Sequence, residues 1–222
     1  MSQEDYFVDK MEEGLIKPWM LVEMTELWQE THGLETDGYF GPATAASFSP
    51  EPPTSLHPFA LSVLLSAIAD LGKGEEGGNN SGEYVEGLLG KTFDGDDDND
   101  GSWCAAAVSH WIKEASEDES VSLNFSLSFG AKALFRNVKS AGASADVPQA
   151  GDIVCWDRGD VGSWQGHIGV VERYDGGILH TIEGNKGSFP SKVRRFRYDL
   201  SKQSRLEGFA RFTDESVSTS NA

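Results

Sequence analysis

The 222-residue chain contains no apolar run near the ~18 to 20 residues that a helix needs to cross a membrane. Basic side chains are also scarce, because 18 Lys and Arg stand against 36 Asp and Glu, for a formal net charge of -18. This charge repels phosphate-rich polymers, so we expect no general affinity for nucleic acid. The opening residues, MSQEDYFVDKMEEG, lack the basic start and apolar stretch of a secretory signal. We therefore expect a chain made in the cytoplasm that does not insert into a membrane.

Cysteine is nearly absent as well, since Cys104 and Cys155 are the only two. Two cysteines are too few for a disulfide framework, and we expect one reactive and one structural thiol. What the chain does contain, 38% hydrophobic and 10% aromatic residues, is typical of a globular protein. Its only approach to a basic patch, in KVRRFRYD from Lys192 to Asp199, has strand-like spacing and is interpreted as a solvated strand face.

Four prolines between Ser47 and Pro58 predict a short, stiff break in the chain. The ten residues at the other end, TDESVSTSNA, are polar and expected to be frayed. The predicted organisation is a small helical module, a Pro-rich linker, a larger domain and a flexible tail, at residues 1–50, 51–58, 59–212 and 213–222.

Helical patterns come first in the larger domain. Pro58 stands at an acceptable first-turn position of an apolar helix that Gly72 ends. Asn80 and Glu83 form a capping-box pattern for a second helix. The remaining two helices are predicted from an N-cap at Ser102 to about Ala115, and over 131–140.

Beyond Pro148 the hydrophobic period changes to alternation. The segments DIVCWD, HIGVVERY, GILHTIEG, KVRRFRYD and LEGFARF are predicted strands, and the Asp-Gly sequence after Tyr174 predicts a hairpin. Helices followed by consecutive strands indicate an α+β fold with helices packed on an antiparallel sheet.

Cys104 lies at the start of its predicted helix, where unpaired N–H groups and the helix dipole favour a thiolate. A thiol nucleophile also needs a neighbouring base. His110 lies roughly 240° around the same helix and faces away, and His180 falls in the middle of a strand. His167, which opens a strand after a glycine-bearing loop, is therefore the candidate base. The alternative is that Cys104 is a small apolar residue of the buried helix face.

The third member of such a site would orient the base. If the strand from His167 to Tyr174 pairs with the strand from Ile178 to Glu183 across the Asp-Gly turn, Glu183 returns beside His167. An acid there would fix the imidazole tautomer and stabilise the imidazolium. Asn185 is the alternative orienter, or an accessory donor.

The segments GSWCAAAVSHWIKEA, VPQAGDIVCWDRGDVGSWQGHIGVVERY and TIEGN resemble the CHAP branch of the NlpC/P60 superfamily of papain-like amidohydrolases and peptidases. The resemblance runs from about Leu61 to Phe212. In that family a Cys at a helix start, a His after a Gly, and the Glu and Asn of an E-G-N segment form the active site. The matching residues here are Cys104, His167, Glu183 and Asn185.

The resemblance implies an enzyme that cleaves an amide bond of bacterial peptidoglycan through a Cys104 thioester. We expect it to be a monomer that requires no cofactor. The bond would join muramic acid to L-alanine or lie within the stem or cross-bridge peptides. Trp103, Trp164 and Gln165 are expected to bind substrate, and the Cys104 N–H to stabilise the oxyanion. The rival interpretations are a non-catalytic wall-binding protein and a Cys-His acyltransferase on the same fold.

An aspartate-rich loop, FDGDDDNDG, precedes the cysteine. It fits the first half of a calcium loop, although Ala107 stands where the last ligand, a glutamate, belongs. Some CHAP enzymes are similar in carrying calcium upstream of the cysteine. Either Ca²⁺ binds here or the loop is a solvated polar segment; the candidate ligands are Asp94, Asp96, Asp98 and Asp100.

The segment from Leu21 to Phe48 resembles a small helical peptidoglycan-binding module. The residues that match its D-G-x-F-G-P-x-T signature are Asp37, Gly38, Phe40, Gly41, Pro42 and Thr44. The alternative is an appendage that packs on the catalytic domain. Without a signal peptide, a wall hydrolase would have to be delivered by other means, and we expect a phage or prophage lysin.

Overall fold

The computed structural model describes residues 22–23, 25–26, 29–30, 35–39, 56–92, 102–160 and 162–219. The chain divides into two compact units, Met1–Ser55 and Leu56–Ala222. The boundary falls inside the Pro-rich segment, and the identities of the N-terminal module and of the linker stay predictions.

In the N-terminal unit, the buried Gln29 holds the Asp-Gly turn of the signature segment. Its Oε1 accepts the backbone N–H of Asp37 and of Gly38, at 3.1 and 2.9 Å, and its Nε2 donates to Asp37 Oδ1 at 2.7 Å. Gly38 has a φ of +67° and lies so close to Val22 that an added Cβ would be 2.7 Å from the Val22 Cγ1. A glycine is therefore required at this turn.

Helices come first in the larger unit, as the sequence predicts. They are α4 (Pro58–Ala69), α5 (Glu83–Thr92), α6 (Cys104–Asp118) and α7 (Ala131–Ala141). His57 caps α4 by accepting the Phe59 N–H. The capping box predicted for α5 is wrong, because the Glu86 side chain, one turn further on, accepts the Gly82 N–H instead.

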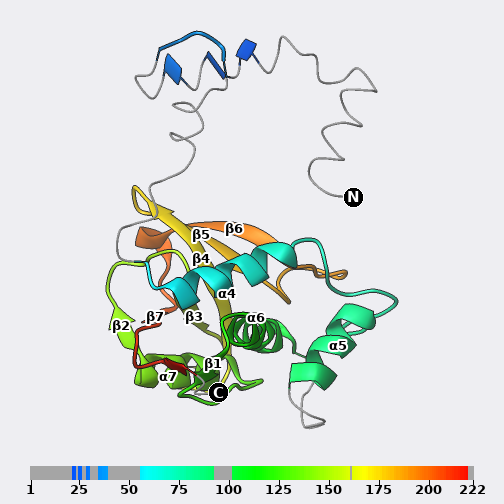
Figure 1. Cartoon of the computed structure of the whole chain (residues 1–222). Coiled ribbons are helices and arrows are strands. Elements are labelled where there is room, and N and C mark those ends of the chain that lie inside the picture. The colour runs from blue at the N-terminus through cyan, green and yellow to red at the C-terminus, as the bar shows by residue number, and fades with distance from the viewer. Residues whose placement is uncertain are drawn as a thin grey trace. The chain divides into compact units, whose positions relative to one another are not determined.

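A six-stranded antiparallel sheet with the order β2-β7-β3-β4-β5-β6 forms the centre of this unit (Figure 1). The five predicted strands are confirmed and form β3 to β7 of this sheet. A short strand that was not predicted, β2, pairs with β7 at one edge. The bounds are β2 (Ala143–Ala145), β3 (Ile153–Asp157), β4 (Gly166–Asp175), β5 (Ile178–Glu183), β6 (Arg194–Asp199) and β7 (Leu206–Arg211), with a 3-10 turn at Leu200–Lys202.

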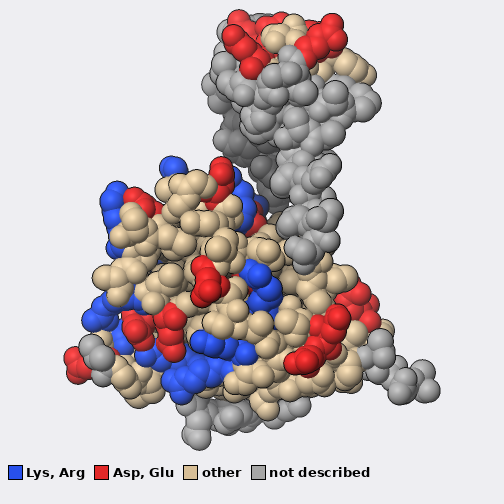
Figure 2. Space-filling view, turned by 90° about the vertical axis from the view of Figure 1, so that its left-hand side faces the viewer, with Lys and Arg blue, Asp and Glu red and all other residues tan. Residues whose placement is uncertain are grey.

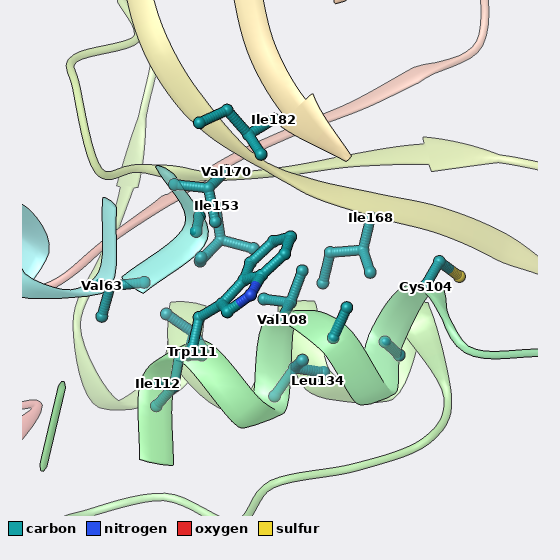
Figure 3. Packing of buried hydrophobic residues seen from close by; sticks show 14 of the residues in the cluster. Val63, Cys104, Val108, Trp111, Ile112, Leu134, Ile153, Ile168, Val170 and Ile182 are labelled. Atoms are coloured by element: carbon teal, nitrogen blue, oxygen red, sulfur yellow. The ribbon is translucent and has the colours of Figure 1, made fainter. Parts of the chain in front are cut away.

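The helices pack on one face of this sheet, so the predicted α+β architecture is confirmed. Trp111 of α6 is fully buried among apolar side chains from α4, α6, α7 and the strands (Figure 3). The other face carries a smaller apolar cluster of Val154, Trp156, Val171, Leu179 and Phe209. Alternation along β3, β4, β5 and β7 supplies both clusters, because successive side chains point to opposite faces.

Two short strands close the domain where a frayed tail was expected. Strand β8 (Val217–Thr219) pairs with β1 (Val121–Leu123), and Ser216 is fully buried. The Ser216 backbone carbonyl accepts the Asn124 N–H at 2.9 Å. The expectation of a flexible tail is therefore wrong for residues 213–219, because this strand pairing and burial hold them in place.

Acidic and basic side chains are interspersed on the face shown in Figure 2, in spite of the strongly negative net charge. Among the described residues, no helix combines the length and the apolar character that crossing a membrane requires.

Candidate active site

Cys104 is the first residue of α6, and its sulfur points away from the packed apolar cluster (Figure 3). The predicted cap, Ser102, is not the N-cap. Trp103 takes that position and makes no side-chain capping bond, because its indole is buried in the core. The N–H groups of the first turn therefore receive no cap from the Trp103 side chain, and they lie at the same end of the helix as the thiol.

His167 and Glu183 lie side by side because of the β4–β5 hairpin. The Asp-Gly turn pairs Tyr174 with Leu179 as predicted, and an unpredicted β-bulge between Val171 and Arg173 shifts the register, so that Val170 pairs with Ile182. His167 Nε2 donates to Glu183 Oε2 at 2.7 Å, and both side chains are buried. Gly169 leaves room for this contact, since a Cβ there would lie 2.6 Å from the Glu183 Cγ.

Glu183, and not Asn185, is the residue in contact with the imidazole. Its carboxylate also accepts bonds from the Thr181 hydroxyl and, at 2.7 Å, from the Tyr198 hydroxyl. Lys186 Nζ lies 3.0 Å from Oε2. A carboxylate with this many donors is held as an acceptor, which places the imidazole proton on Nε2 and leaves Nδ1 free to take a proton.

The nitrogen that remains, His167 Nδ1, is buried and makes no well-formed hydrogen bond within the described part of the chain. The neighbouring Cys104 thiol interacts with this ring strongly enough to shift the pKa values of both groups. Hydrogen bonds in a free enzyme are often loose and tighten when substrate binds. The thiol, the imidazole and the carboxylate therefore form a chain in the order Cys104, His167, Glu183.

Each member of this chain has a shifted pKa. Burial opposes ionisation of Cys104, yet the neighbouring His167 imidazole stabilises the thiolate and brings the pKa of the thiol below its ordinary 9.0. Burial likewise opposes the imidazolium, but Cys104 and Glu183 raise the pKa of His167 above 6.5. For Glu183, burial is outweighed by His167, and the pKa falls below 4.5. The shifts favour a thiolate–imidazolium pair near neutral pH.

The thiol opens onto a cavity of about 610 Å³. Three residues that the sequence predicted for the site lie on its wall: Gln165, Asn185 and Trp164, which is 72% exposed. Asn185 has a left-handed φ of +54°, a conformation that asparagine tolerates better than most residues. Arg158 also lines this cavity and was not predicted, because a single charged residue in a loop forms no sequence pattern.

Trp103 does not contact the cavity, and the expectation that it binds substrate is corrected. It is 0% exposed, its Nε1 donates to the buried Glu75 at 3.3 Å, and its ring packs against Gly184. A Cβ at Gly184 would lie 2.4 Å from the Trp103 ring. Trp103 therefore fixes the start of α6 against the E-G-N segment, and so sets Cys104 relative to Glu183 and Asn185.

The thiolate pair predicts selective modification of Cys104. We expect iodoacetamide to alkylate it with a midpoint below pH 9.0, because a lowered pKa leaves more thiolate at any given pH. Cys155 is fully buried, and burial raises its pKa, so it should stay unmodified in the folded protein. Mass spectrometry of peptides after alkylation at a series of pH values measures both sites. A Cys104 midpoint at or above 9.0 would contradict the assignment.

A metal centre is not found among the described residues, where no group of three or more His, Cys, Asp or Glu side chains is placed to hold an ion. The predicted calcium ligands, Asp94, Asp96, Asp98 and Asp100, lie outside the described residues. The calcium site therefore stays a prediction.

Helices packed on an antiparallel sheet, with a cysteine at a helix start beside a histidine and a glutamate, are consistent with the papain-like fold of CHAP and NlpC/P60 proteins. Residues 96–185 match the family model of the CHAP domain. This range includes Cys104, His167, Glu183 and Asn185. No curated protein matches the chain.

Solved structures with a similar backbone fold include two crystal structures of Ly7917, one of them with the hydrolyzing product of MDP. Each is 20% identical over 68% of this chain, with TM-scores of 0.45 and 0.38. A Staphylococcus aureus protein described as similar to lipoprotein, NLP/P60 family, is 15% identical over 86% of this chain, with a TM-score of 0.38. The matches span 61%, 62% and 61% of those three chains, which is less than two thirds of each.

Proposed function

We propose that this protein is a cysteine-dependent hydrolase that cleaves an amide bond of bacterial peptidoglycan. The observation that carries the proposal is the chain from Cys104 through His167 to Glu183 at the wall of a cavity. The CHAP match over the same residues supports the choice of substrate. A buried Glu–His pair beside a thiol with a lowered pKa is the arrangement that nucleophilic cysteine catalysis needs.

The reaction begins when the Cys104 thiolate attacks the carbonyl carbon of the scissile amide. His167 then protonates the leaving amine as the C–N bond breaks, which leaves a thioester on Cys104. In the second half, His167 takes a proton from water as the water attacks the thioester, and the thiolate leaves. Glu183 stays ionised throughout and stabilises the imidazolium.

The negative charge of each tetrahedral intermediate develops beside the first turn of α6. The backbone N–H of Cys104 is our candidate donor to this oxyanion. Because Cys104 is the first residue of α6, the helix has no carbonyl one turn earlier to accept this N–H. Asn185, on the wall of the same cavity, is a candidate second donor. Trp164 offers an exposed ring and Gln165 an amide along the entrance, and both suit a substrate built from sugars and peptide.

Digestion of purified sacculi tests this function and identifies the bond. The soluble fragments are analysed by mass spectrometry, with and without added Ca²⁺. New muramic-acid carboxyl ends with free alanine amines would identify an amidase, and new amines within the peptides an endopeptidase. Fragments with only new reducing sugar ends, or no fragments under any condition, would contradict the proposal.

Delivery to the wall and attachment to it are further parts of the proposal. The segment that resembles a wall-binding module would hold the enzyme on its substrate, and release as a phage or prophage lysin would bring it there. A full-length protein that sediments with purified sacculi, compared with a variant altered in Asp37 and Gly38, measures the contribution of the module. Equal sedimentation would favour a packing appendage.

A further inference from the structure

Arg158 carries a positive charge on the wall of the cavity that holds Cys104. It follows directly after Asp157, the last residue of β3, and it is exposed. Apart from the thiol, the other described residues of the cavity wall are uncharged: Ser102, Phe129, Gly130, Ala131, Gly159, Trp164, Gln165, Gly166 and Asn185. Although the chain has a net charge of -18, the charged side chain that shares this cavity wall with the reacting sulfur is a cation, Arg158.

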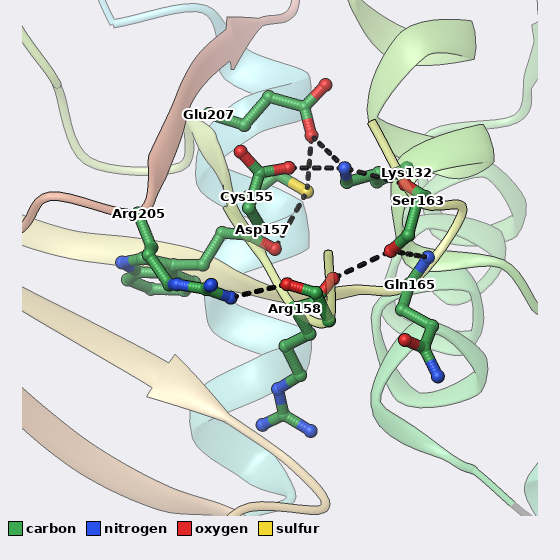
Figure 4. Close-up of polar contacts among 10 residues, drawn as sticks. Lys132, Cys155, Asp157, Arg158, Ser163, Gln165, Arg205 and Glu207 are labelled. Atoms are coloured by element: carbon green, nitrogen blue, oxygen red, sulfur yellow. Dashed lines mark hydrogen bonds and ion pairs between the residues drawn. The ribbon is translucent and has the colours of Figure 1, made fainter. Parts of the chain in front are cut away.

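The backbone at Arg158 is fixed by its neighbours (Figure 4). Its N–H donates to the Gln165 carbonyl at 3.1 Å, and the Ser163 hydroxyl donates to its carbonyl at 2.8 Å. The Arg205 guanidinium binds the Gly159 carbonyl at 2.9 Å. These bonds fix the place from which the Arg158 side chain extends.

A second anchor comes from α7. The ammonium group of Lys132, which is nearly buried, donates to the Ser163 carbonyl at 2.9 Å and pairs with the Asp157 carboxylate. Lys132 therefore connects the helix to both ends of the turn that carries Arg158. Because these bonds already hold the turn, little backbone entropy is lost when the Arg158 side chain binds a ligand.

The Arg158 guanidinium itself makes no ion pair or hydrogen bond with the described residues. Figure 4 shows it extending away from the cluster of Lys132, Asp157 and Glu207, with no interaction drawn to it. By contrast, Arg211 binds Asp152 through two of its nitrogens, at 2.9 and 2.7 Å. The planar donor fork of Arg158 is thus free for a ligand, and the ligand that fits it best is a carboxylate bound by two parallel bonds.

We infer that Arg158 binds a carboxylate of the substrate close to the scissile amide, and that it makes the enzyme selective for peptides in which this group is a free acid. This inference rests on the proposed function and adds the class of stem peptide that is cleaved. Conversion of the carboxylate to a carboxamide keeps its shape but removes the charge and one of the two acceptors. The amidated peptide therefore loses the charge-assisted pair.

The test compares three forms of one muramoyl pentapeptide. In the first, both the α-carboxylate of the second residue and the C-terminal carboxylate are free. Each of the other two has one of these groups converted to a carboxamide. We expect the wild-type protein to cleave one of the amidated forms roughly 10- to 100-fold less efficiently in kcat/KM, mainly through KM, which is the range for a hydrogen bond to a charged group.

Arg158→Gln should bring the three forms within about threefold of one another, and Arg158→Lys should keep part of the preference because it keeps the charge without the fork. The ratio between substrates is the decisive quantity, because loss of a cation beside Cys104 slows the cleavage of all forms alike. Arg136→Gln, an exposed change on α7 outside the cavity wall, is the matched control and should keep the wild-type ratio.

The inference and the proposed function fail in different ways. If the wild-type protein cleaves all three forms equally well, or Arg158→Gln keeps the preference, the role of Arg158 is overturned while peptidoglycan hydrolysis stands. If the wild-type protein cleaves none of the forms and releases nothing from sacculi, both are overturned. Circular dichroism of each variant checks that the fold is intact.

Discussion

Replacement of Cys104 by serine is expected to lower the release of peptidoglycan fragments at least ~10³-fold, the scale on which loss of a nucleophile acts. The serine hydroxyl has nearly the shape of the thiol, but it does not ionise near neutral pH, so the ion pair with His167 is lost. The measurement is kcat/KM on sacculi fragments or on a defined muramoyl peptide. Binding to intact sacculi should not change, since the substitution leaves the cavity wall in place.

Cys155→Ala is the matched control for this experiment. Cys155 lies in β3, fully buried, on the helix side of the sheet, so its truncation costs stability and not chemistry. We expect its kcat/KM to stay within about twofold of wild type, once the folded fraction is accounted for. A Cys104→Ser protein that still lyses cells as well as wild type would contradict the enzyme and favour a non-catalytic wall-binding protein.

The local parts of the site could be predicted from the sequence, because short-range signals determine them. The Asp-Gly turn after Tyr174 predicts the β4–β5 hairpin, and a β-bulge between Val171 and Arg173 shifts the register by one residue, which puts Glu183 on the same face as His167. The predicted N-cap at Ser102 likewise places Cys104 near a helix start, although the helix begins one residue later, after Trp103. The bulge itself was not predicted, because no glycine or proline marks the segment from Val171 to Arg173.

Contacts between distant segments could not be predicted. The partner of Trp103 is Glu75, 28 residues upstream, and the sequence does not reveal whether an aromatic ring beside a nucleophile turns toward the substrate or into the core. Strands β1 and β8 have three residues each, which is too short for alternation to be recognised. The anchoring of Arg158 depends on Lys132 of α7 and Arg205, neither of which has a pattern that points to the site.

Glu183→Gln is expected to lower kcat/KM by roughly 10² to 10⁴, the range in which loss of the acid behind a catalytic histidine acts. Glutamine keeps the shape of the side chain, but its single oxygen cannot accept from all of its neighbours, His167, Thr181, Lys186 and Tyr198. Without the carboxylate charge, the pKa of His167 falls and the pKa of the Cys104 thiol rises. The alkylation midpoint of Cys104 should therefore move to higher pH together with the loss of activity.

Two further variants separate this explanation from its alternatives. Glu172→Gln removes a carboxylate that pairs with Arg195 on the same sheet but does not line the cavity, and it should leave kcat/KM within about twofold. Asn185→Ala should cost roughly 10² to 10³ in kcat, as loss of one donor to the oxyanion, and should leave the alkylation midpoint in place. If Asn185→Ala instead shifts the midpoint while Glu183→Gln does not, Asn185 is the residue that orients the imidazole. Among Glu183, Glu172 and Asn185, only the residue that holds the imidazolium charge is expected to change both the rate of hydrolysis and the ionisation of the thiol.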